Sequence, residues 1–293
     1  MAARPPERGA RLFFILAREA RTGVIFRRGP SKWVRLIKWN TDNDTFEHGQ
    51  WFNGRIYERR CDLSPKGDKL IYFAAKMKQT KFTRHYSWTA ISKPPWLKAL
   101  ALWPKGDCWH GGGLFDDAKN VWLNHFPQQA HLESGFTLKK LIVTANPRAY
   151  GEDEPVLWRR LKRDGWTLRQ EGEFESKGLT SGWPAKSPEI WEKPEKRKRF
   201  TLQMRRVGIG ADINGEWNSL EFEIFDKEGR IKFETGRASW ADWDHRNHLV
   251  YVKAGKIYRL DLRMGDDPKP SEIADFNDQK PTAIKAPPHA QTW

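Results

Sequence analysis

The stretch CDLSPKGDKLIYF, residues 61–73, decides the fold, because a polar turn leads there directly into a run of strand-forming residues. Ser64-Pro65-Lys66-Gly67 has the composition of a tight turn, since proline presets its own φ and glycine accepts a positive φ. Leu70-Ile71-Tyr72-Phe73 is a short run of apolar and aromatic residues. We therefore expect a strand, a turn and a packed strand.

The same pattern recurs along the chain, which makes it a feature of the scaffold. Residues 241–252, ADWDHRNHLVYV, repeat the aspartate, the polar turn and the Leu-(Ile/Val)-Tyr strand of residues 61–73 once one gap is allowed. Looser copies are FDDAKNVWLNH at 115–125 and LKRDGWTLRQ at 161–170. Recurrence of one such unit indicates a repeat architecture.

Further hairpins are expected between the copies. SLEFEIF at 219–225 alternates apolar and polar residues and is followed by a turn and RIKFET at 230–235. Residues 24–39 and 248–262 have the same form. Helical periodicity is scarce, and WLKALALW at 96–103 is flanked by prolines, so we expect a short strand there.

Residues 64–72, SPKGDKLIY, resemble the SPDG-x-x-(I/L)-x-(Y/F) turn of TolB-like and WD40-like β-propeller blades, with Lys66 where those families commonly carry Asp or Asn. Residues 241–262 resemble the same blade unit. The resemblance implies an all-β fold, a single β-propeller of about five or six four-stranded blades. It implies little about function, because propellers host many unrelated activities.

Blade spacing gives the expected organisation. The propeller domain would cover residues 1–262, and residues 263–293 would form a polar C-terminal tail with room for a closing strand at 271–276. The expected blades are listed in chain order: 11–58, 59–104, 105–150, 151–199 and 200–262. Residues 172–200 are rich in Gly, Pro and Lys, and we expect a long loop there.

Composition indicates a folded, basic protein. Aromatic residues make up 13% of the 293 residues, although the mean hydropathy is only −0.79. Each buried ring removes roughly 150–250 Å² from water, so these rings can supply a core. The formal charge of +15 favours contact with a polyanion: nucleic acid, an anionic membrane surface or an acidic protein.

The N-terminal apolar run Leu12–Ala17 is too short for a signal peptide, and Arg18-Glu19 follow it at once. No run of 18 apolar residues exists, so we expect no membrane span and a cytoplasmic location. Cys61 and Cys108 could form one bridge at most, and we expect both to be free.

Motifs for catalysis or metal binding are each incomplete. WHGGGLF, residues 109–115, resembles the His-Gly-Gly-Gly oxyanion motif of lipases and esterases, but the chain lacks a Gly-x-Ser-x-Gly elbow. A glycine run entering a crowded strand is the simpler interpretation. His245 and His248, or Cys108 and His110, supply only two ligands each. We expect no catalytic residues, no metal site and no cofactor.

Two sets of residues are candidates for binding. The segment 186–206 brings cations close to aromatic rings, an arrangement that suits phosphates and bases, although a solvated loop is the alternative. The polyanion-binding candidates are Lys193, Lys196, Arg197, Lys198, Arg199, Arg205 and Arg206. The protein-binding candidates at a propeller rim are Trp103, Trp109, His110, Trp183 and Trp191.

Three functions follow from these patterns. The first is a non-enzymatic propeller scaffold that presents a rigid face to a protein partner. The second is a propeller that binds nucleic acid or another polyanion. The third is a glycan-acting or hydrolytic propeller, in which Asp62, Asp116 and Asp242 would converge. In the alternative interpretation of this last set, each aspartate bonds a neighbouring turn.

Overall fold

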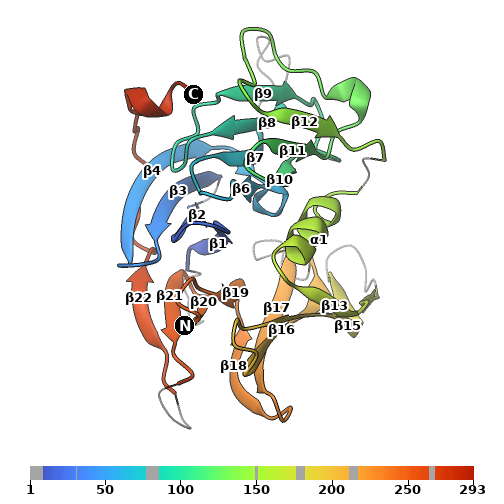
Figure 1. Cartoon of the computed structure of the whole chain (residues 1–293), viewed down its shortest axis with the longest axis vertical. Coiled ribbons are helices and arrows are strands. Elements are labelled where there is room, and N and C mark those ends of the chain that lie inside the picture. The colour runs from blue at the N-terminus through green and yellow to red at the C-terminus, as the bar shows by residue number, and fades with distance from the viewer. Residues whose placement is uncertain are drawn as a thin grey trace, which may run out of the picture. The chain divides into compact units, whose positions relative to one another are not determined.

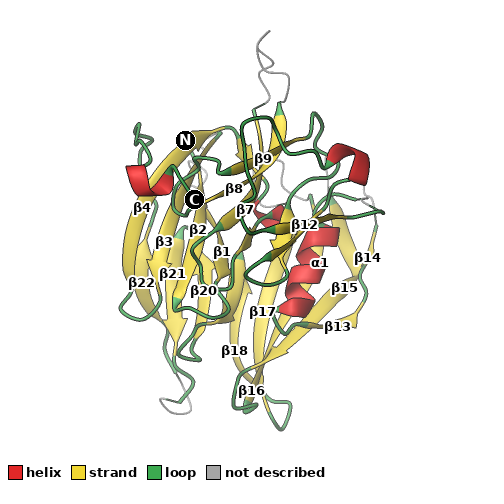
Figure 2. Cartoon of the chain, turned by 45° about the horizontal axis from the view of Figure 1, so that its top comes forward, coloured by secondary structure: helices red, strands yellow, loops and turns green. Residues whose placement is uncertain are grey.

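Strands dominate the computed structural model, which describes residues 9–30, 32–76, 86–148, 151–175, 182–210, 217–263 and 268–293 (Figures 1 and 2). Among these residues there is one α-helix, α1 (Glu154–Arg163). Single 3-10 turns occur at Glu58–Arg60, Pro127–Gln129 and Pro288–Ala290. No described helix is long and apolar enough to cross a membrane. The expected all-β class is confirmed.

The chain divides into two compact units, which are described separately. The N-terminal unit comprises Phe14–Leu161 with Lys280–Trp293, and the C-terminal unit comprises Lys162–Gln279 with the residues up to Phe13. The division therefore falls within the first strand and within α1.

Three sheets lie in the first half of the chain, each built from consecutive strands. The first has the order β1-β2-β3-β4: Arg11–Leu16, Thr22–Arg28, Trp33–Asn40 and Thr45–Asn53. The second contains β5 to β9: Arg55–Ile56, Asp62–Leu63, Leu70–Ala75, Ser87–Ser92 and Ala101–Pro104. The third contains β10 to β12: Gly113–Phe115, Asn120–Leu123 and Ile142–Ala145. Strand β12 pairs with β11 in parallel, whereas the pairings β2–β3, β3–β4, β5–β7, β6–β7, β7–β8, β8–β9 and β10–β11 are antiparallel.

Two sheets lie in the C-terminal unit. One contains β13 to β18: Thr167–Gln170, Glu173–Phe174, Trp183–Pro194, Phe200–Ile209, Asn218–Asp226 and Ile231–Arg237. The other has the order β19-β20-β21-β22: Trp240–Trp243, Leu249–Lys253, Lys256–Leu260 and Ser271–Asp275. A strand was expected at 271–276, and β22 lies there, antiparallel to β21.

Side-chain alternation explains why these segments form strands. In β17, Leu220, Phe222 and Ile224 are buried, while the intervening Glu221 and Glu223 are partly exposed. This period of two is that of a strand with one face in a core. Burying each of these apolar side chains contributes about 1.5–3 kcal/mol to stability.

The core of the N-terminal unit uses aromatic and branched residues from several strands. Trp103, Phe115 and Ile71 are at most 1% exposed and belong to one cluster. The partly buried Trp293 packs against the same cluster, so residues 280–293, expected to belong to a polar tail, contribute to this core. Cys61 is a buried free thiol, and Cys108 is a free thiol of intermediate exposure.

The hairpins expected at 24–39, 219–235 and 248–262 are confirmed as β2–β3, β17–β18 and β20–β21. The repeat copy at 161–170 is different, because α1 rather than a strand precedes its turn. Two further expectations are wrong. Residues 183–194 form strand β15 instead of a loop, and the β15–β16 pairing spans the expected blade boundary at 199/200.

One turn geometry joins four of the hairpins. The backbone N–H of the fourth turn residue donates to the carbonyl of the first in 64–67, 195–198, 226–229 and 244–247. The fourth residue has a positive φ each time, and it is Gly67, Lys198, Gly229 and Asn247 in chain order. Glycine adopts this conformation without the steric cost that a Cβ brings. The Ser64–Gly67 turn is therefore one example of a recurrent structural device.

Candidate functional site

Two of these turns lie against each other in the C-terminal unit. The β15–β16 turn spans 195–199 and the β19–β20 turn spans 244–248. The backbone N–H of Lys196 donates to Oδ1 of Asn247 at 3.1 Å, and the side-chain amide of Asn247 donates to Glu195. We call residues 195–199 and 244–248 the paired-turn surface.

The acidic residues of the paired-turn surface point inward. Glu195 is 3% exposed and Asp244 is 2% exposed. Oε1 of Glu195 accepts the backbone N–H of Arg199 at 3.1 Å, and Oδ1 of Asp244 accepts those of Arg246 at 2.8 Å and His248 at 2.9 Å. Both carboxylates are therefore used to close their own turns, as acidic residues commonly do.

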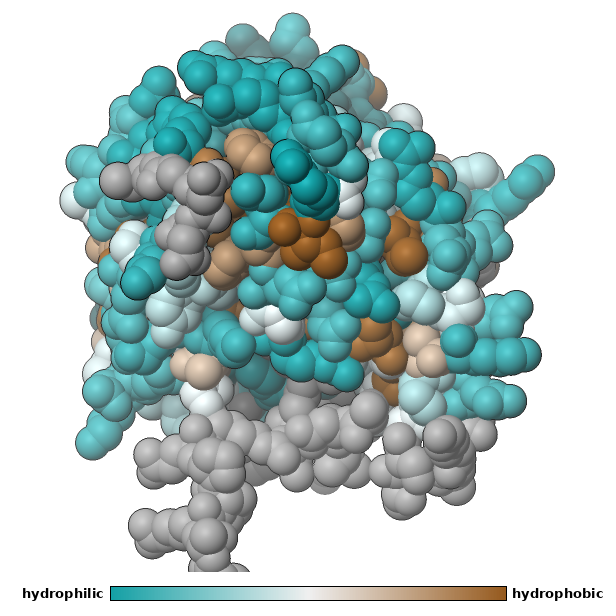
Figure 3. Space-filling model, turned by 90° about the horizontal axis from the view of Figure 1, so that it is seen from below, coloured by the Kyte–Doolittle hydropathy of each residue, from teal (hydrophilic) through white to brown (hydrophobic). Residues whose placement is uncertain are grey.

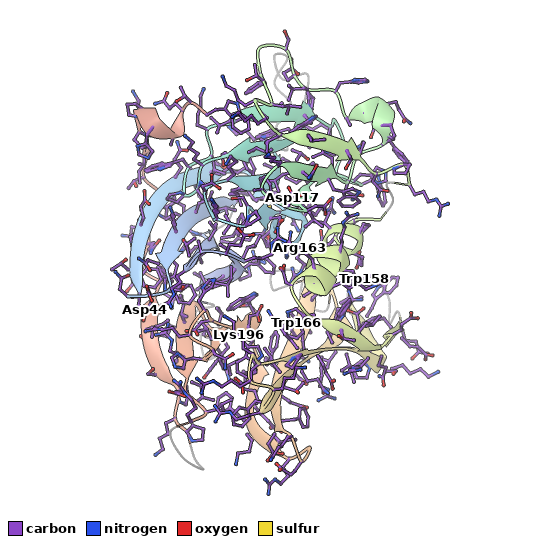
Figure 4. The ribbon with its side chains drawn as sticks, viewed as in Figure 1. Asp44, Asp117, Trp158, Arg163, Trp166 and Lys196 are labelled. Atoms are coloured by element: carbon purple, nitrogen blue, oxygen red, sulfur yellow. The ribbon has the colours of Figure 1, made fainter. Side chains whose placement is uncertain are left out.

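The four cations of the 195–199 turn are exposed. Lys196, Arg197 and Lys198 are exposed, and their side chains form no ion pair with any residue that the structure describes (Lys196 is labelled in Figure 4). Arg199 is exposed and lies 3.4 Å from Oε1 of the buried Glu195. The surface thus presents positive charge whose nearest acids are covered.

The other three polyanion-binding candidates are neutralised by acidic residues of the two C-terminal sheets. Their ion pairs are Lys193–Asp242 at 2.7 Å, Arg205–Glu223 at 2.7 Å and Arg206–Glu189 at 2.6 Å. Glu189 also accepts the indole N–H of Trp191 at 2.8 Å, so the Arg206 pair belongs to a buried network. The structure therefore brings only four of the seven candidates together on one accessible turn.

The protein-binding candidates are scattered over the two units. Trp103 and Trp191 are 1% and 0% exposed, so they present no surface to a partner. Trp109 is 68% exposed and Trp183 is 50% exposed. His110 is half-buried, and its ring packs edge-on against Phe126 at 4.9 Å. Burial lowers the pKa of His110. Because two of the five are buried, the set does not form one exposed patch.

The glycine run 111–113 has a structural role in the N-terminal unit. The N–H of Gly111 donates to the carbonyl of Asn124 and that of Gly112 to the hydroxyl of Thr89, so neither points at a free oxyanion position. A Cβ on Gly112 would lie 2.1 Å from the carbonyl oxygen of Arg60. The run is therefore glycine because backbone and side chains approach it closely.

Arg60 is the group that this glycine run encloses. Its side chain is 0% exposed, and Nε donates to Asp153 at 2.7 Å. Its Nη atoms donate to Glu152 at 3.2 Å and to the carbonyl of Cys108 at 2.6 Å. The guanidinium also lies 4.6 Å from the ring centroid of Tyr57. A buried charge held by this many partners is a structural element.

The three aspartates of the hydrolytic hypothesis are each engaged locally. Asp62 accepts the backbone N–H of Phe115 at 2.8 Å. Asp116 receives two hydrogen bonds from Arg159, at 2.9 and 3.0 Å, and Asp242 pairs with Lys193. These contacts match the alternative in which each aspartate stabilises neighbouring structure. Within the described residues no group of three or more His, Cys, Asp or Glu side chains could hold a metal ion.

Sequence reasoning missed residues 244–248 as part of the binding surface. Their signal was present, because both turns combine a leading acid with basic residues in EKRKR and DHRNH. What the sequence did not indicate was that Asn247 would join one turn to the other.

Comparison with known proteins gives no functional precedent. No protein-family model matches the chain, and no curated protein matches it. A crystal structure of uncharacterized protein lmo1340 from Listeria monocytogenes EGD-e matches with 9% sequence identity and a TM-score of 0.31, covering 94% of this chain and 86% of that one. A TM-score this low carries no argument about fold or function.

Proposed function

We propose that the protein is a non-enzymatic β-propeller scaffold that binds a polyanion, with nucleic acid as the class to test, through the paired-turn surface. The observation that carries the proposal is the segregation of charge on that surface. Lys196, Arg197, Lys198 and Arg199 are exposed, whereas Glu195 and Asp244 are buried.

Electrostatics supports this assignment. Lysine and arginine side chains that neutralise phosphates release condensed counterions, which supplies much of the affinity of nucleic-acid binding. A lysine or arginine that already forms an ion pair contributes less to this affinity, because the ion pair must break before the side chain can contact a phosphate. Lys196, Arg197 and Lys198 have no acid to leave among the described residues.

Backbone conformation gives independent support. Lys198, the fourth residue of its turn, has a φ of +55°. The turns 64–67 and 226–229 have glycine at the fourth position. A side chain in this region costs about 1 kcal/mol relative to glycine. A lysine at this position is consistent with a role of its charge in binding.

The propeller part of the proposal rests on sheet order. All five described sheets are built from strands that are consecutive in sequence, with three to six strands each. Radial repetition of such sheets is how a propeller protects its strand edges. The resemblance of residues 64–72 to a blade turn agrees with this order.

Fluorescence anisotropy with labelled single-stranded and double-stranded DNA and RNA tests the binding site. The triple variant Lys196→Gln/Arg197→Gln/Lys198→Gln should bind at least about tenfold more weakly, and the slope of log affinity against log salt should fall by about 2–3. The matched control is Lys66→Gln/Lys119→Gln/Lys140→Gln, which removes three other exposed cations.

Equal losses in the two triple variants would mean that total charge, and not this surface, sets the affinity. Binding to none of the nucleic acids, and to no heparin column at low salt, would refute the polyanion function. Circular dichroism of both variants checks that neither loss reflects unfolding.

A second candidate is a protein-binding scaffold, favoured by one observation. Trp109 is 68% exposed, and its backbone N–H donates to Oδ1 of Asp107 at 3.0 Å. An ordered loop therefore presents the indole ring. Exposed tryptophans often dominate protein interfaces. Affinity purification from the native cells should recover a protein that Trp109→Ser no longer retains. Recovery of the same proteins with Trp109→Ser would exclude this surface.

A further inference from the structure

The paired-turn surface contains two histidines, His245 and His248. Hydrophilic residues predominate on the face of the protein shown in Figure 3, and hydrophobic residues form small separate groups there. Among hydrophilic side chains, histidine is the one that ordinarily gains or loses a proton close to neutral pH. His248 differs from an ordinary surface histidine because its ring accepts a hydrogen bond from Arg263.

The contact with Arg263 defines where the proton of the neutral His248 ring lies. Nη2 of Arg263 is 2.6 Å from Nε2 of His248. A guanidinium has only donors, so Nε2 accepts the hydrogen bond and the single ring proton is on Nδ1. Nδ1 lies 3.5 Å from Oδ2 of Asp244, and it is buried without a hydrogen bond to any residue that the structure describes. His248 is therefore neutral in this arrangement.

Carboxylates stand close to both nitrogens of the His248 ring. Nε2 is 3.5 Å from Oδ2 of Asp261, and Nδ1 faces Asp244. Hydrogen bonds from Arg263 lower the pKa of Asp261 to about 2, so Asp261 stays charged when the ring gains a proton. The charged neighbours are Asp244 and Arg246 of the same turn, Arg259 of β21, and Asp261 and Arg263 after β21.

We propose that His248 is a proton switch for the paired-turn surface, which binds a polyanion more tightly below about pH 6.5 than above it. This inference rests on the polyanion function proposed above. A proton on Nε2 places two donors 2.6 Å apart, so the contact with Arg263 must open. The new N–H can donate to Asp261, for which it then competes with Arg263. His248 gains a charge, and the guanidinium is released from the ring.

The place of these two side chains links the proton to binding. His248 ends the 244–248 turn, which Asn247 joins to the 195–199 turn. Arg263 is exposed, and the charge of Glu195 acts on it, so it lies within electrostatic range of the 195–199 turn. A phosphate chain on this surface therefore meets one or two more cations at low pH. One more phosphate contact should raise the affinity about tenfold at 0.1 M salt.

Nitrogen-15 NMR of the histidine side chains tests the switch without a ligand. At pH 8 we expect Nδ1 of His248 to show the chemical shift of a protonated ring nitrogen and Nε2 that of an unprotonated one. Both should reach the values of imidazolium by pH 5. His248→Gln identifies the signals. A ring that carries its proton on Nε2 at pH 8, or that remains neutral at pH 5, would overturn the proposal.

Fluorescence anisotropy with labelled single-stranded DNA at pH 7.5 and pH 5.5, at constant ionic strength, tests the consequence. The parent should bind about tenfold more tightly at pH 5.5, and the slope of log affinity against log salt should increase by about 1. His248→Gln should lose most of this difference. The matched control is His245→Gln, which removes the other histidine of the turn and should keep most of it, because the His248–Arg263 contact remains.

The outcomes separate the switch from the proposed function. DNA binding of equal strength at the two pH values would overturn the switch and leave the polyanion function intact. The same holds for a pH effect that survives His248→Gln or disappears in His245→Gln. Absence of DNA binding at both pH values would refute the proposed function and this inference with it.

Discussion

Arg60 and the paired-turn surface show two opposite uses of positive charge in one protein. Arg60 is 0% exposed, and its donors are met by Asp153, Glu152 and the carbonyl of Cys108. At the paired turn Glu195 and Asp244 are buried, whereas Lys196, Arg197 and Lys198 are exposed. Both regions contribute to a formal charge of +15. The position of the acids, and not the number of cations, separates structural charge from charge that can bind a partner.

The largest effect is expected from replacing Arg60, the buried cation of this comparison. Arg60→Met leaves Asp153 without its arginine and opens space beside Gly112, so stability should fall by about 3–5 kcal/mol. Urea denaturation followed by tryptophan fluorescence measures the change. Lys66→Gln, which removes an exposed cation, is the control and should stay within about 0.5 kcal/mol of the parent. A loss below about 1 kcal/mol for Arg60→Met would contradict a structural role.

The effect of pH on stability tests a second buried group of the N-terminal unit, His125. His125 is 0% exposed, its Nδ1 donates to the carbonyl of Gln129 at 3.4 Å, and its Nε2 accepts from the hydroxyl of Thr89 at 2.8 Å. Burial lowers the pKa of His125 to about 4, from the ordinary histidine value of about 6.5. The unfolded chain therefore takes up this proton first as the pH falls.

The sign of the effect follows from that order of protonation. This histidine contributes full stability above about pH 6.5, and the contribution falls by about 3 kcal/mol as the pH drops to about 4. Urea denaturation between pH 7 and pH 4 measures the slope. His125→Asn should start less stable at pH 7 and lose less stability over this range. Equal slopes for parent and variant would show that His125 is not the group responsible.

The smallest effect is expected at Lys198, whose backbone conformation favours glycine although its side chain supplies a charge for binding. Lys198→Gly relieves a φ of +55° and should stabilise the protein by about 0.5–1 kcal/mol, while removing one phosphate-binding charge. Thermal unfolding and DNA binding are measured on the same sample. Lys198→Gln removes the charge but keeps the strained conformation, so it should weaken binding without raising stability. No stabilisation by glycine would argue against strain at this turn.

Local patterns allowed much of the fold to be predicted from the sequence. Ser64-Pro65-Lys66-Gly67 and Asp244-His245-Arg246-Asn247 both predicted turns, because their residues suit the required backbone angles. Alternation in residues 219–225 predicted strand β17, since only a strand sorts side chains with a period of two.

The errors occurred where long-range packing decided the outcome. Residues 183–194 contain three prolines and several charges, which predicted a loop, yet they form the long strand β15 because β16 pairs with them. Helix α1 was missed although Asp153 and Pro155 suit a helix start. Gly165 follows its end, which is the usual position for glycine. The short amphipathic pattern of α1 was missed because residues 161–170 were interpreted as a loose copy of the β repeat.

The candidate site was only partly predictable for a related reason. The basic composition of 193–206 was visible, but the acids that neutralise Lys193, Arg205 and Arg206 lie on strands paired across the sheet or beyond it. Ion pairs of this kind depend on strand register, which composition does not encode. Exposure of Lys196, Arg197 and Lys198 became evident only with the turn geometry.

The return of residues 280–293 to the N-terminal unit has a consequence for synthesis of the chain. The side chain of Gln50 donates to the carbonyl of Ile284 at 3.0 Å, and Lys93 donates to that of His289 at 3.0 Å. Contacts this distant in sequence form late, because the intervening loop must close first. During translation the sheets of the N-terminal unit can pair early, but Trp293 completes their core only after the whole C-terminal unit has left the ribosome. A nascent chain stalled before residue 280 should therefore remain sensitive to protease in its first half.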